Sequence, residues 1–158
     1  MTLRFVCSRT LVVLLTTGGV AARVDAQGVV SAGVGVGGAV GDRHKNAVAN
    51  GRHGAAYVQL HLPVFPIALR VDALLQKFPD GRYSTAVIAD GVYVLPIPLV
   101  QPYVLAGYGK YGVGQNGQIA GWNAGGGVRI RTPVITLYVE AHRHQRIERD
   151  LLTVGISR

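Results

Sequence analysis

The sequence predicts an all-β fold, an eight-stranded antiparallel up-and-down transmembrane β-barrel, and three observations lead to this prediction. Apolar and polar residues alternate with a period of two in several segments, as on a strand with one apolar and one polar face. Most of these segments are 8 to 12 residues long, close to the roughly 9 to 11 residues that a tilted membrane-spanning strand needs. The connections between them alternate between short and long, as in an outer-membrane barrel.

The first 26 residues are predicted to be a signal peptide rather than part of the fold. Arg4 and Arg9 form a positive region, Leu11 to Ala22 is an apolar run, and Val24 to Ala26 ("VDA") offers a cleavage site. The apolar run is too short to span a bilayer as a helix. The barrel domain is therefore predicted to cover residues 27–158, in a protein exported through a cleaved signal peptide.

Composition narrows the possible partners. Removing residues 1–26 takes away three of the 16 basic and one of the eight acidic residues, which leaves 13 against 7, a net charge of +6. The only cysteine is Cys7, so the exported part has no disulfide. Export argues against nucleic acid as a partner. The glycine runs "GVGVGG" and "GGG" are followed by no strand-to-helix transition, so they indicate no phosphate loop, and no cofactor is expected.

Eight segments of the exported part are predicted to be strands. Strand-forming, alternating residues fill them, and turn or loop residues separate them. Their approximate bounds are Val29–Val40, Ala55–Pro63, Ile67–Gln76, Arg82–Tyr93, Val100–Tyr111, Ile119–Arg131, Val134–His144 and Leu151–Ser157.

The connections fall into two alternating classes. Those after the second, fourth and sixth strands are tight and contain proline ("PVFP", "LPIPL", "RTP"), whereas those after the odd strands are longer or more polar ("GDRHKNAVANGRHG", "KFPDGR", "GQNGQ", "QRIERD"). Short periplasmic turns and longer external loops are typical of outer-membrane barrels. This alternation implies an even number of strands, with both termini at the end of the barrel that carries the short turns.

The alternation alone leaves open which face is inside. In the third strand, Leu69 and Val71 alternate with Arg70 and Asp72; a soluble secreted ligand-binding barrel would turn the aliphatic set inward, and a membrane barrel would turn it outward. Three features favour the membrane barrel: the polar faces are rich in glycine, opposite charges fall on them, and aromatic residues occur near strand ends, where an aromatic girdle requires them. These aromatic residues are Tyr57, Tyr83, Tyr93, Tyr108, Tyr111 and Trp122.

The charges on the polar faces are predicted to form a network inside the lumen. An ion buried in a low-dielectric interior is costly unless it is paired. A barrel of eight strands has room for side chains but hardly for a solute path. We therefore expect these residues to neutralise one another and to plug the lumen: Arg70, Asp72, Asp90, Arg129 and Glu140.

An enzymatic alternative rests on Glu140, His142 and His144, with serines such as Ser84 or Ser157 elsewhere. Some eight-stranded outer-membrane barrels are lipid A deacylases with a serine, a histidine and an acid, and such a triad needs the base beside the nucleophile. No serine adjoins these histidines in the sequence. We expect no catalytic residues, and histidines that cap the outer rim. No metal site is expected, because the spacing fixes no third ligand beside the two histidines.

Basic residues in the predicted external loops offer a surface for anions. If they face outward, they meet the phosphates of lipopolysaccharide or other anionic polymers; the alternative is a solvated charged rim. The candidates for such contacts are Arg43, Lys45, Arg52, Arg146 and Arg149.

The segments "QPYVLAGYGKYG", "GWNAGGGVRIRTP", "ITLYVEAHRH" and "LLTVGISR" together resemble the C-terminal half of small bacterial outer-membrane β-barrels of the OmpA-like and OmpX-like type. The resemblance covers roughly residues 100–158. It implies an outer-membrane location, a monomer, contact with membrane lipid and with the barrel-insertion machinery, and a structural or surface-interaction role. Such barrels usually end on an aromatic residue, whereas this chain ends on Ser157 and Arg158.

Overall fold

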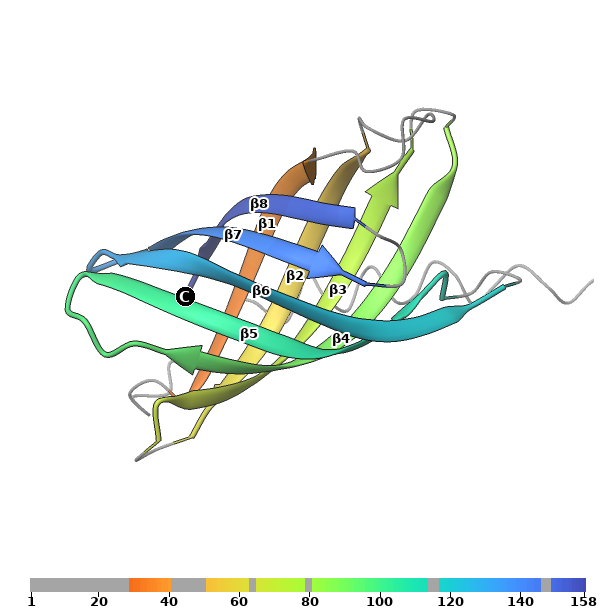
Figure 1. Ribbon diagram of the computed structural model, residues 1–158. Coiled ribbons are helices and arrows are strands. Elements are labelled where there is room, and N and C mark those ends of the chain that lie inside the picture. The colour runs from red at the N-terminus through yellow and green to blue at the C-terminus, as the bar shows by residue number, and fades with distance from the viewer. Residues whose placement is uncertain (1–28, 41–50, 63–64, 79–80, 114–116, 146–148) are drawn as a thin grey trace, which may run out of the picture.

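The computed structural model describes residues 29–40, 51–62, 65–78, 81–113, 117–145 and 149–158. The predicted signal peptide lies outside them. The described residues form one closed barrel in which each strand pairs with its neighbours in the chain (Figure 1). The strands are β1 (Val30–Val40), β2 (Arg52–His61), β3 (Ile67–Lys77), β4 (Tyr83–Val94), β5 (Val100–Tyr111), β6 (Ile119–Arg131), β7 (Thr136–His144) and β8 (Arg149–Ser157).

The barrel closes between its first and last strands. β1 and β8 are antiparallel, with Val34 opposite Ile156, and the backbone N–H of Arg158 donates to the carbonyl of Ala32 at 2.9 Å. The start of β1 and the end of β8 therefore lie at the same end as the proline-containing turns. This end is called the turn end below, and the opposite one the loop end. The predicted fold class is confirmed.

The largest difference from the predicted strand bounds is in β2, which begins at Arg52 rather than at Ala55. In the sequence, Gly54 favours a loop at this point. In the structure the alternation continues through Gly54, so that His53 faces the lumen and is 5% exposed. A lumen partner, the hydroxyl of Thr153 at 2.8 Å from His53 Nε2, extends the strand past the glycine.

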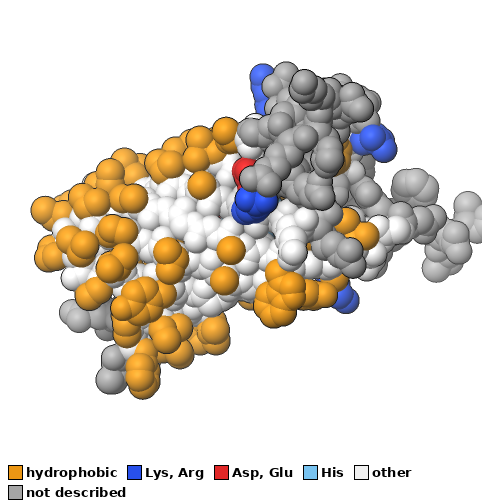
Figure 2. Space-filling view, viewed as in Figure 1, with side chains coloured by type: hydrophobic (Ala, Val, Ile, Leu, Met, Phe, Trp, Pro, Cys, Tyr) orange, Lys and Arg blue, Asp and Glu red, His pale blue; other side chains and the backbone are white. Residues whose placement is uncertain are grey.

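The barrel is inside out relative to a water-soluble protein. Among the described residues, 34 large hydrophobic side chains are exposed, and 13 polar or charged side chains are buried, against 12 buried hydrophobic ones. Figure 2 shows hydrophobic side chains spread over the outer wall. Water-soluble monomers rarely expose so much contiguous apolar surface. The soluble alternative required the aliphatic face to be inside, and that is wrong: Leu69 and Val71 are more than half exposed.

No helix in the described part of the chain is long and apolar enough to span a bilayer.

Glycines on the lumen side of the wall make room for rings from neighbouring strands. A Cβ added to Gly155 would lie 2.5 Å from the hydroxyl of Tyr138, and one added to Gly127 would lie 2.6 Å from that of Tyr103. Glycine in a strand interior often marks such a close approach. The narrow barrel can therefore hold large side chains.

The aromatic residues divide between the two faces. Tyr83, Tyr93, Tyr108 and Trp122 are exposed on the outer wall, between 45% and 64%. The prediction that Tyr57 and Tyr111 belong to the girdle is wrong, because they are 3% and 4% exposed inside the lumen. Both lie in the inward phase of their strands, which nearness to a strand end does not reveal.

Candidate functional site

The centre of the lumen is organised around Arg70 on β3, which is 2% exposed. Its Nε donates to Asp72 Oδ1 at 2.9 Å, and its Nη2 donates to the same oxygen at 2.5 Å. Across the barrel, its Nη1 donates to Glu140 Oε2 at 2.6 Å, and its Nη2 donates to Oε1 at 3.1 Å. One guanidinium thus binds two carboxylates, one of them in the bidentate geometry that is strongest for such pairs.

Two tyrosines enclose this cluster. The Arg70 guanidinium lies 4.0 Å from the ring centroid of Tyr57, a cation–π contact. The hydroxyl of Tyr103 donates to Glu140 Oε2 at 2.7 Å. Glu140 is therefore held from both sides, by Arg70 and by Tyr103.

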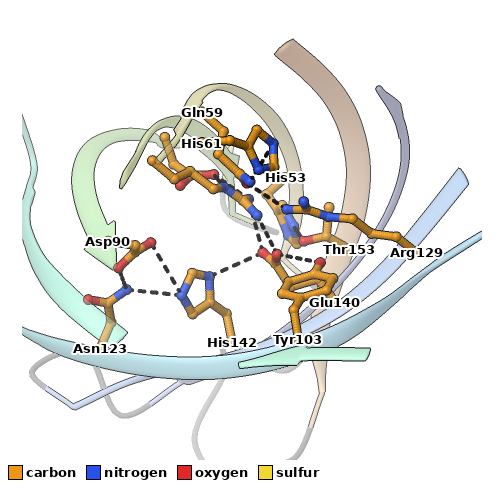
Figure 3. A network of polar contacts seen from close by, with 12 residues as sticks. His53, Gln59, His61, Asp90, Tyr103, Asn123, Arg129, Glu140, His142 and Thr153 are labelled. Carbon is orange, nitrogen blue, oxygen red and sulfur yellow. Dashed lines mark hydrogen bonds and ion pairs between the residues drawn. The ribbon is translucent and has the colours of Figure 1, made fainter. Parts of the chain in front are cut away.

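Asp90 joins the cluster through two polar side chains. Asn123 Nδ2 donates to Asp90 Oδ1 at 2.8 Å and lies 2.9 Å from His142 Nε2. His142 in turn places Nδ1 at 3.4 Å from Glu140 Oε1 and Nε2 at 3.8 Å from Asp90 Oδ2 (Figure 3). Because the amide donates to Nε2, the ring proton belongs on Nδ1, where it points toward Glu140.

Arg129 continues the network toward the turn end. Its Nη2 donates to Gln59 Oε1 at 2.6 Å, and its guanidinium lies 4.4 Å from the ring centroid of Tyr103. Gln59 Nε2 donates to His61 Nε2 at 3.0 Å. Within the described residues Arg129 has no carboxylate within ion-pair distance, so its partners are a neutral amide and an aromatic ring.

Side chains fill the lumen on both sides of this network, toward the loop end and toward the turn end. Toward the loop end, Tyr111 contacts His144 Nδ1 at 2.7 Å, and one apolar cluster comprises Ala55, Leu74, Ala86, Ile88, Tyr111 and Leu151. A second cluster comprises Ala68, Val92, Tyr103 and Leu105. A cavity of about 10 Å³ near His53 and Gln76 lies at the loop end, which is room for about one water molecule.

The structure brings together three of the five predicted network residues by direct contact: Arg70, Asp72 and Glu140. Asp90 is reached through Asn123 and His142, and Arg129 through Tyr103. Four further residues of the network were not predicted to belong to it: Tyr57, which was expected in the girdle, and Gln59, Tyr103 and Asn123. Gln59 and Asn123 occupy the polar phase of their strands, so alternation could have placed them inside; Tyr103 carried no such signal.

The expectation that the histidines cap the outer rim is wrong. His142 is 6% exposed and His144 is fully buried, because both continue the inward phase of β7 that Tyr138 and Glu140 begin. Their hydrogen-bond partners in the described part of the chain are Asn123 and Tyr111, with no serine. One serine does contact a histidine, Ser31 at 3.3 Å from His61 Nε2, but His61 has no carboxylate partner among the described residues.

No group of three or more potential ligands in the described residues could hold a metal ion. Of the predicted anion contacts, Arg43, Lys45 and Arg146 lie outside the described residues. Arg52 is exposed at the start of β2, and Arg149 opens β8.

No protein-family model matches the sequence, and no curated protein matches it. Solved structures share the fold. A de novo designed transmembrane β-barrel superimposes with a TM-score of 0.62 at 18% identity, covering 81% of this chain and 92% of the design. Neisserial surface protein A gives 0.56 at 13% identity, covering 81% and 92%, and the Yersinia pestis outer-membrane protein Ail gives 0.52 at 12%, covering 80% and 97%. The predicted resemblance to small outer-membrane barrels is therefore confirmed for the fold.

Proposed function

We propose that this protein is an outer-membrane barrel with a structural or surface-interaction role, whose lumen is sealed by paired charges. The observation that carries the proposal is the Arg70 cluster: one buried guanidinium bound to Asp72 and Glu140 from opposite sides of the barrel. The apolar outer wall supports placement in lipid. The fold shared with outer-membrane proteins supports the same location.

The cluster suits a plug because its charges tie opposite walls together. β3 and β7 are not neighbours in the barrel, yet Arg70 joins Glu140 across it with two hydrogen bonds. An ion that entered the lumen would have to displace these contacts. Slow or absent conduction follows from that arrangement.

Planar-bilayer recordings test the sealed lumen. We expect the wild-type protein to show no porin-like steps, and Glu140→Ala to lower the stability of the barrel without opening a large conductance. Glu140→Gln, which keeps the side-chain volume and one acceptor, is the matched control for loss of charge. Steady large currents through the wild-type protein, or a stable Glu140→Ala barrel with porin-like currents, would overturn the plug.

A surface role is favoured by basic side chains at the loop end. Arg52 on β2 is opposite Lys77 on β3, and both are exposed. With Arg43, Lys45, Arg146 and Arg149 they would form a basic rim that attracts phosphates of lipopolysaccharide. Binding of the purified barrel to anionic glycolipid vesicles should weaken as salt rises from 50 to 500 mM; salt-independent binding would contradict this electrostatic role.

A further inference from the structure

The outer wall near the loop end carries an exposed aromatic pair on β5 and β6. The rings of Tyr108 and Trp122 meet edge to face, with centroids 5.2 Å apart and planes at 77°. Their strands place them directly opposite each other. Tyr108 is 47% exposed and Trp122 is 64% exposed, the latter among the more exposed hydrophobic side chains of the wall. An amphipathic aromatic platform therefore faces out from the barrel.

Two cations flank this platform on the same face. Lys110 on β5 is opposite Ala120, two residues before Trp122, and Arg143 on β7 is opposite Ala124, two residues after it. Both are exposed, between inward-facing neighbours. Neither has an ion pair with another described residue. Trp122 thus lies midway between two basic side chains.

The register gives the span of this arrangement. Lys110 and Arg143 are separated by two inter-strand spacings and by four residues along the strand direction, which places their Cα atoms roughly 16 Å apart. If the side chains of Lys110 and Arg143 lean toward each other over the outer wall, the space between their charged groups matches a ligand of disaccharide size with an anion at each end. A single phosphate would satisfy only one of the two.

We propose that Lys110, Arg143, Tyr108 and Trp122 form a binding site for a bisphosphorylated disaccharide glycolipid of the surrounding outer leaflet. The two cations would bind the two phosphates, and the aromatic pair would lie against the sugar and the upper part of the acyl chains, where amphipathic rings are stabilised. The inference rests on the proposed orientation of the barrel, with the loop end outward. It differs from the basic rim of Arg52 and Lys77, which lies on other strands.

One acidic residue in the described part of the chain lies next to the site. Asp150 on β8 is exposed and opposite Arg143, on the side of Arg143 away from Trp122. It would compete with a phosphate for Arg143. Removing its charge should therefore tighten binding, which a general loss of stability would not do.

Native mass spectrometry of the full chain in detergent, titrated with bisphosphorylated lipid A, tests the proposal. Dephosphorylated lipid A, with the same acyl chains, measures what the phosphates contribute. We expect the bisphosphorylated form to bind with 1:1 stoichiometry, and Lys110→Gln combined with Arg143→Gln to weaken it by roughly 10- to 30-fold. Asp150→Asn should strengthen it by roughly two- to fivefold.

Matched variants at the turn end separate a built site from a generic interface. Arg158→Gln removes an exposed arginine from the opposite end of the wall, and Tyr93→Leu removes an exposed aromatic residue there. Neither should change the affinity more than twofold, whereas Trp122→Leu should reduce it by roughly tenfold. Equal losses at both ends, or equal binding of the two glycolipids, would overturn the site.

The two proposals fail in different ways. If the basic rim on Arg52 and Lys77 carries all the glycolipid binding, Arg52→Gln with Lys77→Gln abolishes 1:1 binding and the Lys110 and Arg143 variants do not, which refutes this site alone. If the protein does not insert in bilayers, it fails to float with lipid vesicles on a density gradient, which refutes the proposed membrane role.

Discussion

The two faces of β7 carry opposite chemistries within nine residues. Tyr138, Glu140, His142 and His144 point into the lumen and are at most 6% exposed, whereas Leu137 and Val139 point outward and are 44% and 48% exposed. Glu140, His142 and His144 each have a hydrogen-bond partner on another strand, and the ring of Tyr138 packs edge to face against Tyr57 on β2. The outward groups need only an apolar medium. The lumen is therefore specified by pairs of residues, and the wall by single residues.

Because of this difference, the stability lost on a lumen substitution should depend on how many buried partners it leaves without a contact. The stability lost on a wall substitution should depend on the depth of the residue in the bilayer. Substitutions on the two faces can therefore be ranked against each other. Free energies of unfolding, from urea titrations followed by heat-modifiable electrophoretic mobility, provide a common scale.

Arg70→Ala should have the largest effect, because it leaves Asp72 and Glu140 buried without their cation. We expect a loss of roughly 3 to 5 kcal/mol. The control is the triple variant Arg70→Met, Asp72→Leu, Glu140→Leu, which removes all three charges and should recover much of the loss. A single variant as stable as the wild type would contradict the pairing.

Val139→Lys places a charge on the outer wall near the middle of β7. Because the bilayer midplane is the most costly depth for a lysine, the loss should be roughly 2 to 4 kcal/mol. Ile130→Lys makes the same change on the outer wall close to the turn end of β6 and should cost roughly 0 to 1 kcal/mol. Equal costs at the two positions would argue that the wall does not face lipid.

Glycines allow the same comparison with a single methyl group. Gly33→Ala would bring a Cβ to 2.5 Å from the ring of Tyr57, so we expect a loss of roughly 1 to 3 kcal/mol. Gly91→Ala points outward, and the nearest atom to its Cβ would be 3.8 Å away, so it should be almost neutral. If the two variants unfold at the same urea concentration, the close packing of rings on lumen glycines is wrong.

Apart from the control variants, Arg129→Gln should have the smallest effect on stability. It removes a hydrogen bond to Gln59 and a cation–π contact with Tyr103, but it leaves no contacting carboxylate without its partner. The free energy of unfolding should therefore fall by roughly 1 to 2 kcal/mol. Arg129→Leu should lower the stability more than Arg129→Gln does, because a leucine cannot donate a hydrogen bond to Gln59. A loss as large as that of Arg70→Ala would show that Arg129 neutralises the lumen carboxylates at a distance.

Most of the fold could be predicted from the sequence, because strand alternation and the two classes of connection are local properties. The inward location of Arg70, Asp72 and Glu140 also follows from local phase. Local phase does not predict which residues pair with each other. Arg70 contacts Glu140, 70 residues away in the sequence and across the width of the barrel, and Arg129 contacts Gln59 rather than an acidic residue. Those choices depend on barrel register and on which glycines admit a ring. Nearness to a strand end suggests the rim for His142 and His144, whereas the barrel is deep enough to bury both.

Lipid accessibility along β7 tests the central claim most directly. Cys7 is the only cysteine and lies in the predicted signal peptide, so single cysteine substitutions in residues 27–158 allow spin labels at Leu137, Val139 and Ala141 on one face and at Tyr138 and His142 on the other. In lipid vesicles, relaxation by oxygen, which concentrates in the bilayer, should be high at the first three positions and low at the other two. The opposite pattern, or no alternation, would contradict a barrel that turns its aliphatic face to lipid and its charges inward.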